Sequence, residues 1–96
     1  MAEVRVIARV VAREGKTNEL EALLRKLIVP TRAEVGCIFY ELFQSNIPGL
    51  FYFNELWESQ AHLNAHSASR HCIEILGEAK ALLQEPLEVN LLKSVE

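Results

Sequence analysis

The spacing of apolar side chains constrains the fold of this chain more than any other feature, because it changes between two periods along the sequence. Residues 3–12 alternate between apolar and other side chains, and this period of two is typical of a strand with one buried face. Residues 37–44, 50–57 and 87–95 also have the pattern of strands. Residues 37–44 and 50–57 are apolar on both faces, which indicates that both faces are covered. In residues 37–44, alternation predicts Cys37 and Phe39 on one face and Ile38 and Tyr40 on the other.

The segments between these strands follow a helical period instead. Residues 17–28 place leucines three and four positions apart, as in an amphipathic helix, and Thr17 or Asn18 could cap its start. Pro30 should bend or interrupt the last turn. Ser59 is a suitable N-cap for a second helical region, which breaks around residues 67–70 and resumes until Pro86.

This order of elements predicts an α+β fold of the ferredoxin-like type, β-α-β-β-α-β, with a split second helix. Such a fold has a four-stranded antiparallel sheet with its helices on one face. The other face then needs a cover. Because two of the strands are apolar on both sides, the sequence predicts a homodimer in which two sheets pack together. We expect residues 1–96 to form a single domain.

Composition excludes several classes of function. The net charge is −3 and the ten basic residues are scattered, so we expect no nucleic-acid binding. The chain has neither a signal-peptide pattern nor an apolar run of about 18 to 20 residues, so we expect no membrane association and a cytoplasmic location. Cys37 and Cys72 lack metal-ligand spacing. They are interpreted as reduced thiols, with a disulfide or redox pair as the alternative.

The residues best suited to chemistry follow the third predicted strand. Phe51, Phe53 and Trp57 share one face and could line a pocket for a flat ring, or could simply belong to the core. His66 is the best candidate for a general base, because the imidazole pKa lies near neutrality. We expect Trp57 and His66 to reach the same pocket and to clamp one ring between them.

Other polar residues are further candidates for the site. His71 begins the next helix, where the dipole favours a neutral base, or it is a surface residue. His62 is either an exposed helix residue or a substrate ligand; no third ligand accompanies His62 and His66 in the sequence, so we expect no metal. Glu55, if buried, needs a partner such as Arg9. Arg9 is solvated, pairs across a dimer, or binds a substrate anion.

Several short motifs occur together in a characteristic order. They are Glu34-Val35-Gly36-Cys37, Glu55-Leu56-Trp57-Glu58-Ser59, and Ala61-His62-Leu63-x-Ala65-His66 followed five residues on by His71. In this order and spacing the chain resembles the antibiotic biosynthesis monooxygenase family, and it is most similar to the quinol monooxygenase type. The resemblance covers nearly the whole chain.

The resemblance implies a dimeric α+β barrel and an oxygenase that uses neither metal nor flavin. In such an enzyme a phenol or quinol is deprotonated, and its anion reacts directly with O₂. The resemblance therefore implies no cofactor, and a small aromatic substrate and O₂ as partners.

Two alternatives stay open within the same resemblance. A second branch of the family isomerises a small enolisable carbonyl compound and has the same spaced histidines. A non-catalytic dimer that binds a small ligand is the other. A third branch degrades haem, but its first-strand asparagine corresponds to about Ile7 here, which disfavours that activity.

Overall fold

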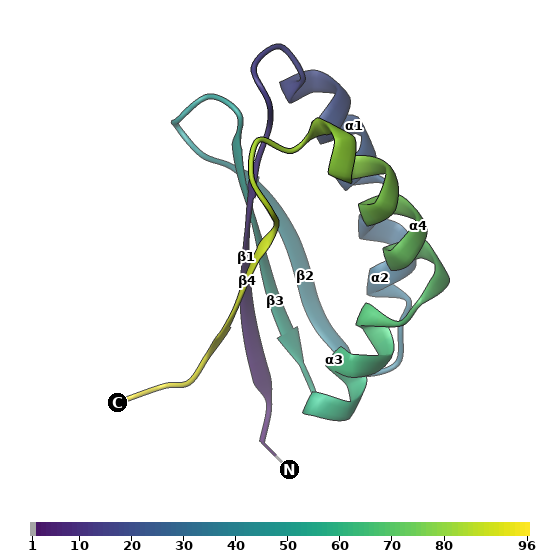
Figure 1. Cartoon of the computed structure of the whole chain (residues 1–96). Helices are drawn as coiled ribbons and strands as arrows, with labels where there is room; N and C mark the ends of the chain where they lie inside the picture. The colour runs from purple at the N-terminus through teal and green to yellow at the C-terminus, as the bar shows by residue number, and fades with distance from the viewer. Residues whose placement is uncertain (1) are drawn as a thin grey trace.

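The structure, a computed structural model, describes residues 2–96 and contains one four-stranded antiparallel sheet (Figure 1). Its strands are β1 (Val4–Val11), β2 (Cys37–Gln44), β3 (Leu50–Trp57) and β4 (Glu88–Leu92), in the spatial order β2-β3-β1-β4. β1 and β3 therefore form the centre of the sheet. The predicted α+β, ferredoxin-like arrangement is confirmed.

All the helices lie on one face of the sheet (Figure 1). They are α1 (Thr17–Arg25), α2 (Ile28–Arg32), α3 (Gln60–Ser67), α4 (Arg70–Ala79) and a final 3₁₀ turn, η1 (Lys80–Leu82). None of the helices in residues 2–96 is long and apolar enough to cross a membrane.

The predicted helix breaks are present, with small shifts. The first helical segment is interrupted before Pro30, which lies within the first turn of α2, where no intrahelical donor is needed. The Ser59 hydroxyl accepts a hydrogen bond from the His62 backbone N–H and caps α3, as predicted. Ser69 caps α4 in the same way. The expected cap of α1 at Thr17 or Asn18 is wrong, since α1 begins after Lys16 without a side-chain cap.

The core lies between the sheet and the helices. The inward face of β1 carries Val6, Ala8 and Val10, all at most 4% exposed. Phe51, Phe53, Glu55 and Trp57 face the same side from β3, and leucines of α1 and α3 cover them, namely Leu20, Leu24 and Leu63. Phe53 and Trp57 therefore lie on the face of the sheet that the helices cover.

A β-bulge at the start of β2 changes the predicted faces of that strand. The pairing with β3 shifts register between Cys37 and Phe39. Cys37 is opposite Trp57 on the helix side, whereas alternation had predicted it on the same face as Phe39. Ile38, the extra residue, is 44% exposed. A bulge inserts one residue without a partner, so alternation fails at that point.

The outer face of the sheet is only partly covered in the single chain. Phe43 and Leu92 are 51% and 47% exposed there. The same face carries a polar group in which the Asn54 side chain donates to Glu41, and the Arg5 guanidinium lies 5.3 Å from the Phe39 ring centre. This face therefore combines exposed apolar side chains with hydrogen-bonding groups.

Candidate active site

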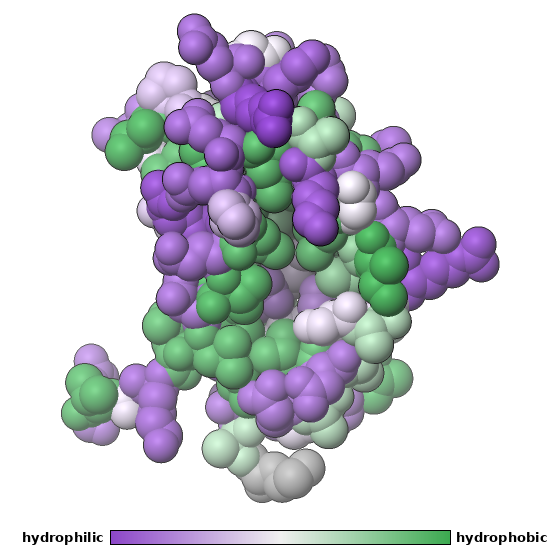
Figure 2. Space-filling view, viewed as in Figure 1, coloured by the Kyte–Doolittle hydropathy of each residue, from purple (hydrophilic) through white to green (hydrophobic). Residues whose placement is uncertain are grey.

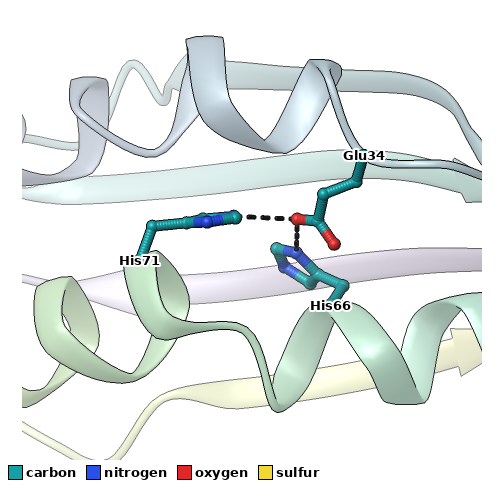
Figure 3. Close-up of side chains that lie close together, drawn as sticks. All are labelled: Glu34, His66 and His71. Carbon is teal, nitrogen blue, oxygen red and sulfur yellow. Dashed lines mark hydrogen bonds and ion pairs between the residues drawn. The ribbon is translucent and has the colours of Figure 1, made fainter.

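Three side chains that are distant in sequence meet in a buried cluster between the helices and β2 (Figure 3). Glu34 lies between α2 and β2, His66 in the last turn of α3, and His71 in the first turn of α4. Oε2 of Glu34 lies 2.7 Å from Nδ1 of His66 and 2.8 Å from Nε2 of His71. The side chains of His66, Glu34 and His71 are only 8%, 16% and 25% exposed. We call these three residues the Glu34 cluster.

The Glu34 cluster determines how the His66 ring is oriented and which of its nitrogens is available. An ionised carboxylate only accepts hydrogen bonds, so the nitrogen facing it must be a donor. This assigns the ring proton of neutral His66 to Nδ1 and leaves the lone pair on Nε2. Nε2 lies 3.9 Å from Sγ of Cys72, on the side of the ring away from Glu34. The free lone pair of His66 therefore faces a different environment from its hydrogen-bonded edge.

The cluster also contains the donor atoms of a possible metal site. One ligand atom from each of Glu34, His66 and His71 lies within 4.8 Å of the others. Glu34 thus supplies the third ligand that the sequence had not revealed, although beside His71 and not beside His62. In the geometry observed, Oε2 of Glu34 occupies the point at which both nitrogens aim. A metal bound about 2.0 to 2.1 Å from each imidazole would require this carboxylate to withdraw, so the arrangement fits a carboxylate shared by two imidazoles better.

His66 also lines a small pocket between the sheet and α3 and α4. The pocket encloses about 70 Å³, and its walls are mainly apolar. Its lining includes Tyr40, Phe53, Glu55, Leu63, Cys72 and Val89. Since β4 is an edge strand and Val89 is 51% exposed, the pocket is open at this edge of the sheet.

Trp57 packs against the His66 ring and does not line the pocket. The indole is completely buried, and its ring centre lies 4.7 Å from that of His66 at an interplanar angle of 30°. The two rings are already in contact, so no substrate ring fits between them. The expected clamp is therefore wrong. Alternation predicted the correct face for Trp57 but could not predict its depth.

Glu55 is a buried carboxyl group within the pocket wall. It is 5% exposed, and its Oε1 accepts a hydrogen bond of 2.9 Å from the Trp57 indole N–H. Burial raises the pKa of Glu55, and the nearby Glu34 adds to this rise, while the Trp57 hydrogen bond and His66 oppose it. The pKa of the neighbouring Cys72 thiol is raised to about 11, chiefly by burial, so this thiol is protonated at neutral pH.

Three predicted site residues lie away from the pocket. Arg9 is on the outer face of the sheet and pairs with Glu85, so the suggested pairing with Glu55 is wrong. Phe51 is a core residue that borders a separate hollow near α1. His62 is half-buried at the base of α3, where its Nδ1 lies 2.8 Å from the Ser59 hydroxyl.

His71 occupies an intermediate position. It does not line the pocket, but Glu34 connects it to His66. His71 therefore influences the pocket through the Glu34 carboxylate, which it shares with His66.

Gly36 explains why His62 has this position. Its φ is +88°, which favours glycine, and a Cβ there would lie 2.2 Å from Cγ of the His62 ring. The imidazole therefore packs directly on the glycine backbone. Gly36 lies between Glu34 and the start of β2. Its backbone conformation therefore also sets the position of Glu34 in the Glu34 cluster.

Replacing Gly36 by alanine is expected to lower the free energy of unfolding by about 2 to 4 kcal/mol, from backbone strain plus displacement of His62. The matched control is Gly15→Ala, because Gly15 has a similar φ of +79° but nothing within 4 Å of the position that an added Cβ would take. We expect that control to cost only about 1 to 2 kcal/mol. Urea denaturation of both variants measures the difference, and equal losses would contradict the contact with His62.

Sequence reasoning missed three residues of the site: Glu34, Tyr40 and Cys72. Glu34 stands in the Glu-x-Gly-Cys motif, which was the available signal. Its partners are 32 and 37 residues away, so no local pattern could connect them. Tyr40 packs its ring edge against His66, with ring centres 5.6 Å apart.

Comparison with known proteins places this architecture in a family. The family model for antibiotic biosynthesis monooxygenase matches residues 3–77. The Mycobacterium tuberculosis protein Rv0793, whose name assigns it provisionally as a monooxygenase, is 36% identical over 93 residues, covering 97% of this chain and 92% of that protein.

Solved structures agree over the whole fold. The structure of Rv0793 superposes with a TM-score of 0.93 at 35% identity, covering 99% of this chain and 97% of that one. PA3566 from Pseudomonas aeruginosa gives a TM-score of 0.91 at 33% identity, covering 100% and 97%. A conserved protein of Methanosarcina mazei gives 0.90 at 30% identity, covering 97% and 93%. From the matched domain and these similarities, the chain belongs to the antibiotic biosynthesis monooxygenase family.

Proposed function

We propose that this protein is a cofactor-independent monooxygenase that oxidises a phenol or hydroquinone with O₂, and that His66 is its general base. One observation carries the proposal. Nδ1 of His66 is bound to Glu34, while Nε2 lies 3.9 Å from Sγ of Cys72, and His66 and Cys72 both line an apolar pocket beside β4. This is the arrangement that a base needs to accept a proton from a hydroxyl group in the pocket.

Proton transfer starts the proposed reaction. A substrate hydroxyl takes the position beside Nε2 that now faces the Cys72 thiol, and it gives its proton to His66. The imidazolium that forms is stabilised by the Glu34 carboxylate on its opposite edge, as in other histidine–carboxylate pairs. Trp57, stacked on the ring, limits its rotation. The histidine is thus held in one tautomer and one orientation.

Oxygen chemistry follows on the substrate itself. The aromatic anion supplies both electrons of a new bond between one of its ring carbons and O₂, and the peroxide takes the proton back from His66 to give a hydroperoxide. Loss of water from this adduct breaks the O–O bond and leaves a carbonyl oxygen on the ring. For a hydroquinone the balance is one hydroquinone and one O₂ to one hydroxyquinone and one water. Apolar walls favour the step, because they exclude water that would solvate the anion.

The isomerase alternative is favoured by one specific observation. His66 and Glu55 line the same pocket, so an imidazole and a carboxyl group can both reach one ligand, and burial raises the pKa of Glu55. Such a pair could move a proton between two carbons of an enolisable carbonyl compound. The oxygenase remains the preferred proposal, because the apolar lining suits an aromatic ring.

Oxygen uptake separates these functions. We expect purified protein to consume O₂ with 1,4-naphthohydroquinone above the buffer rate, and to do so equally after treatment with EDTA. Loss of activity to the chelator, with recovery on adding one metal, would contradict the cofactor-free mechanism. If no uptake occurs but the protein catalyses exchange of deuterium from solvent into the carbon beside a ketone, the isomerase is correct.

We also propose that the protein works in the cytoplasm as a homodimer joined through the outer face of the sheet. The exposed apolar side chains on that face, Phe43 and Leu92, support the dimer, and the free thiols of Cys37 and Cys72 support the location. We expect sedimentation at micromolar concentration to give about twice the 10.9 kDa chain mass. A Phe43→Asp variant should shift the equilibrium toward the monomer, and a wild-type monomer at that concentration would contradict the proposal.

A further inference from the structure

A larger apolar groove lies beside the His66 pocket. The groove runs between α4, η1 and the central strand β1 and encloses about 300 Å³. Its walls include Val10, Leu24, Leu76, Gly77, Leu83 and Leu87. Leu76 and Leu87 border both spaces, so the groove and the pocket are direct neighbours. Figure 2 shows hydrophobic side chains gathered along the hollow between the sheet and the helices on this side of the molecule.

The two spaces follow β1 along its length. Val6 lines the pocket and Val10 lines the groove, and both point to the helix side. Four residues of an antiparallel strand span about 14 Å. The combined hollow is therefore long and narrow, with the His66 imidazole at one end.

Size indicates that one ligand occupies both spaces. Small-molecule sites usually measure about 300 to 1,000 Å³. The pocket alone, at about 70 Å³, is well below that range, whereas the pocket and groove together reach it. Glu55 and His66 line the pocket end, and Lys80 is the one ionisable residue among the described residues that line the groove.

Gly77 gives independent support for a ligand in the groove. It lies within α4, where glycine costs about 1 kcal/mol relative to alanine. Packing within the chain does not require it, since nothing lies within 4 Å of the position its Cβ would take. The missing side chain leaves space in the groove wall. A ligand that passes along α4 would use this space.

We infer that the substrate is a phenol or hydroquinone with an apolar chain, whose ring occupies the His66 pocket and whose chain lies in the groove along Leu76, Gly77 and Leu87. The reacting group of this ligand rests on the proposed function. The apolar chain of the ligand does not rest on the proposed function, because it is assigned from the shape and the lining of the groove alone.

Binding of 4-alkylphenols from ethyl to hexyl tests the inference by titration calorimetry under anaerobic conditions. Each buried methylene contributes about 0.8 kcal/mol, so affinity should rise about fourfold per added carbon. Equal affinity for ethylphenol and hexylphenol would overturn the inference.

Gly77→Leu tests where the chain lies. A leucine at this position fills the groove wall and has a better helix propensity than glycine, so the fold should be retained. We expect the hexyl-to-ethyl affinity ratio to fall at least tenfold in Gly77→Leu and to change little in the matched control Gly77→Ala. A ratio that is unchanged in Gly77→Leu would contradict the assignment of the groove.

The outcome is separable from that of the proposed function. If alkyl chain length governs affinity but no hydroquinone is oxidised, the groove assignment holds and the oxygenase proposal fails. If hydroquinones are oxidised with no effect of chain length on affinity, the oxygenase proposal holds and the groove assignment fails.

Discussion

His66→Ala is expected to lower kcat for oxidation of a hydroquinone by a factor of about 10² to 10⁴, which is the usual contribution of a positioned general base. The reason is geometric. Nε2 of His66 lies beside Cys72, which lines the pocket with it, and Nδ1 is bound to a buried carboxylate. Oxygen uptake against substrate concentration measures the change in kcat and KM.

The matched control is His62→Ala, since His62 lies one turn earlier on α3 but packs on Gly36 and outside the pocket. We expect it to keep kcat within a few-fold of the wild type. If His66→Ala keeps the wild-type kcat, His66 is not the base, and His71 is the next residue to test.

Glu34→Gln should have the second largest effect, although Glu34 does not line the pocket. An amide can donate as well as accept, so the His66 ring is no longer restricted to the tautomer with its lone pair on Nε2. In the serine-protease triad, the corresponding change from carboxylate to amide lowers kcat by about 10⁴. That factor is an upper limit here, because Trp57 also restrains the His66 ring. We expect kcat to fall by a factor of about 10².

A positioning role predicts more than a loss of rate. In Glu34→Gln, kcat should fall with little change in KM, because Glu34 orients the base and does not line the pocket. Glu34→Asp, which restores the charge, should recover part of the activity. Glu41→Gln on the outer face of the sheet is the matched control. Equal kcat in Glu34→Gln and Glu41→Gln would exclude this role.

Much of the fold could be predicted from periodicity, because each strand has one face that must be buried. The alternation in residues 3–12 predicted which side chains of β1 face the helices, and Ser59 marked the start of α3. The bulge at Ile38 could not be predicted in this way. A single unpaired residue leaves the composition of the strand unchanged and is fixed by pairing with β3.

The site was predictable only in part, for a related reason. His66 was found because an imidazole can accept a proton near neutral pH, and Glu55 because a carboxyl group needs a partner if it is buried. The depth of Trp57 was missed, since periodicity indicates the direction of a side chain but not what covers it. Glu34 was missed because its function in the site depends on contacts with α3 and α4, which only the tertiary fold creates.

Oxygen labelling tests directly whether the pocket of His66 is the site of a cofactor-free monooxygenase. Metal-free protein is mixed with 1,4-naphthohydroquinone under ¹⁸O₂, and the quinone product is analysed by mass spectrometry beside a protein-free control for spontaneous oxidation. We expect one ¹⁸O atom in the hydroxyquinone formed by the wild type. We expect His66→Ala to form this product more slowly by a factor of about 10² or more. Product without ¹⁸O, or equal rates of labelling by the two proteins, would contradict it.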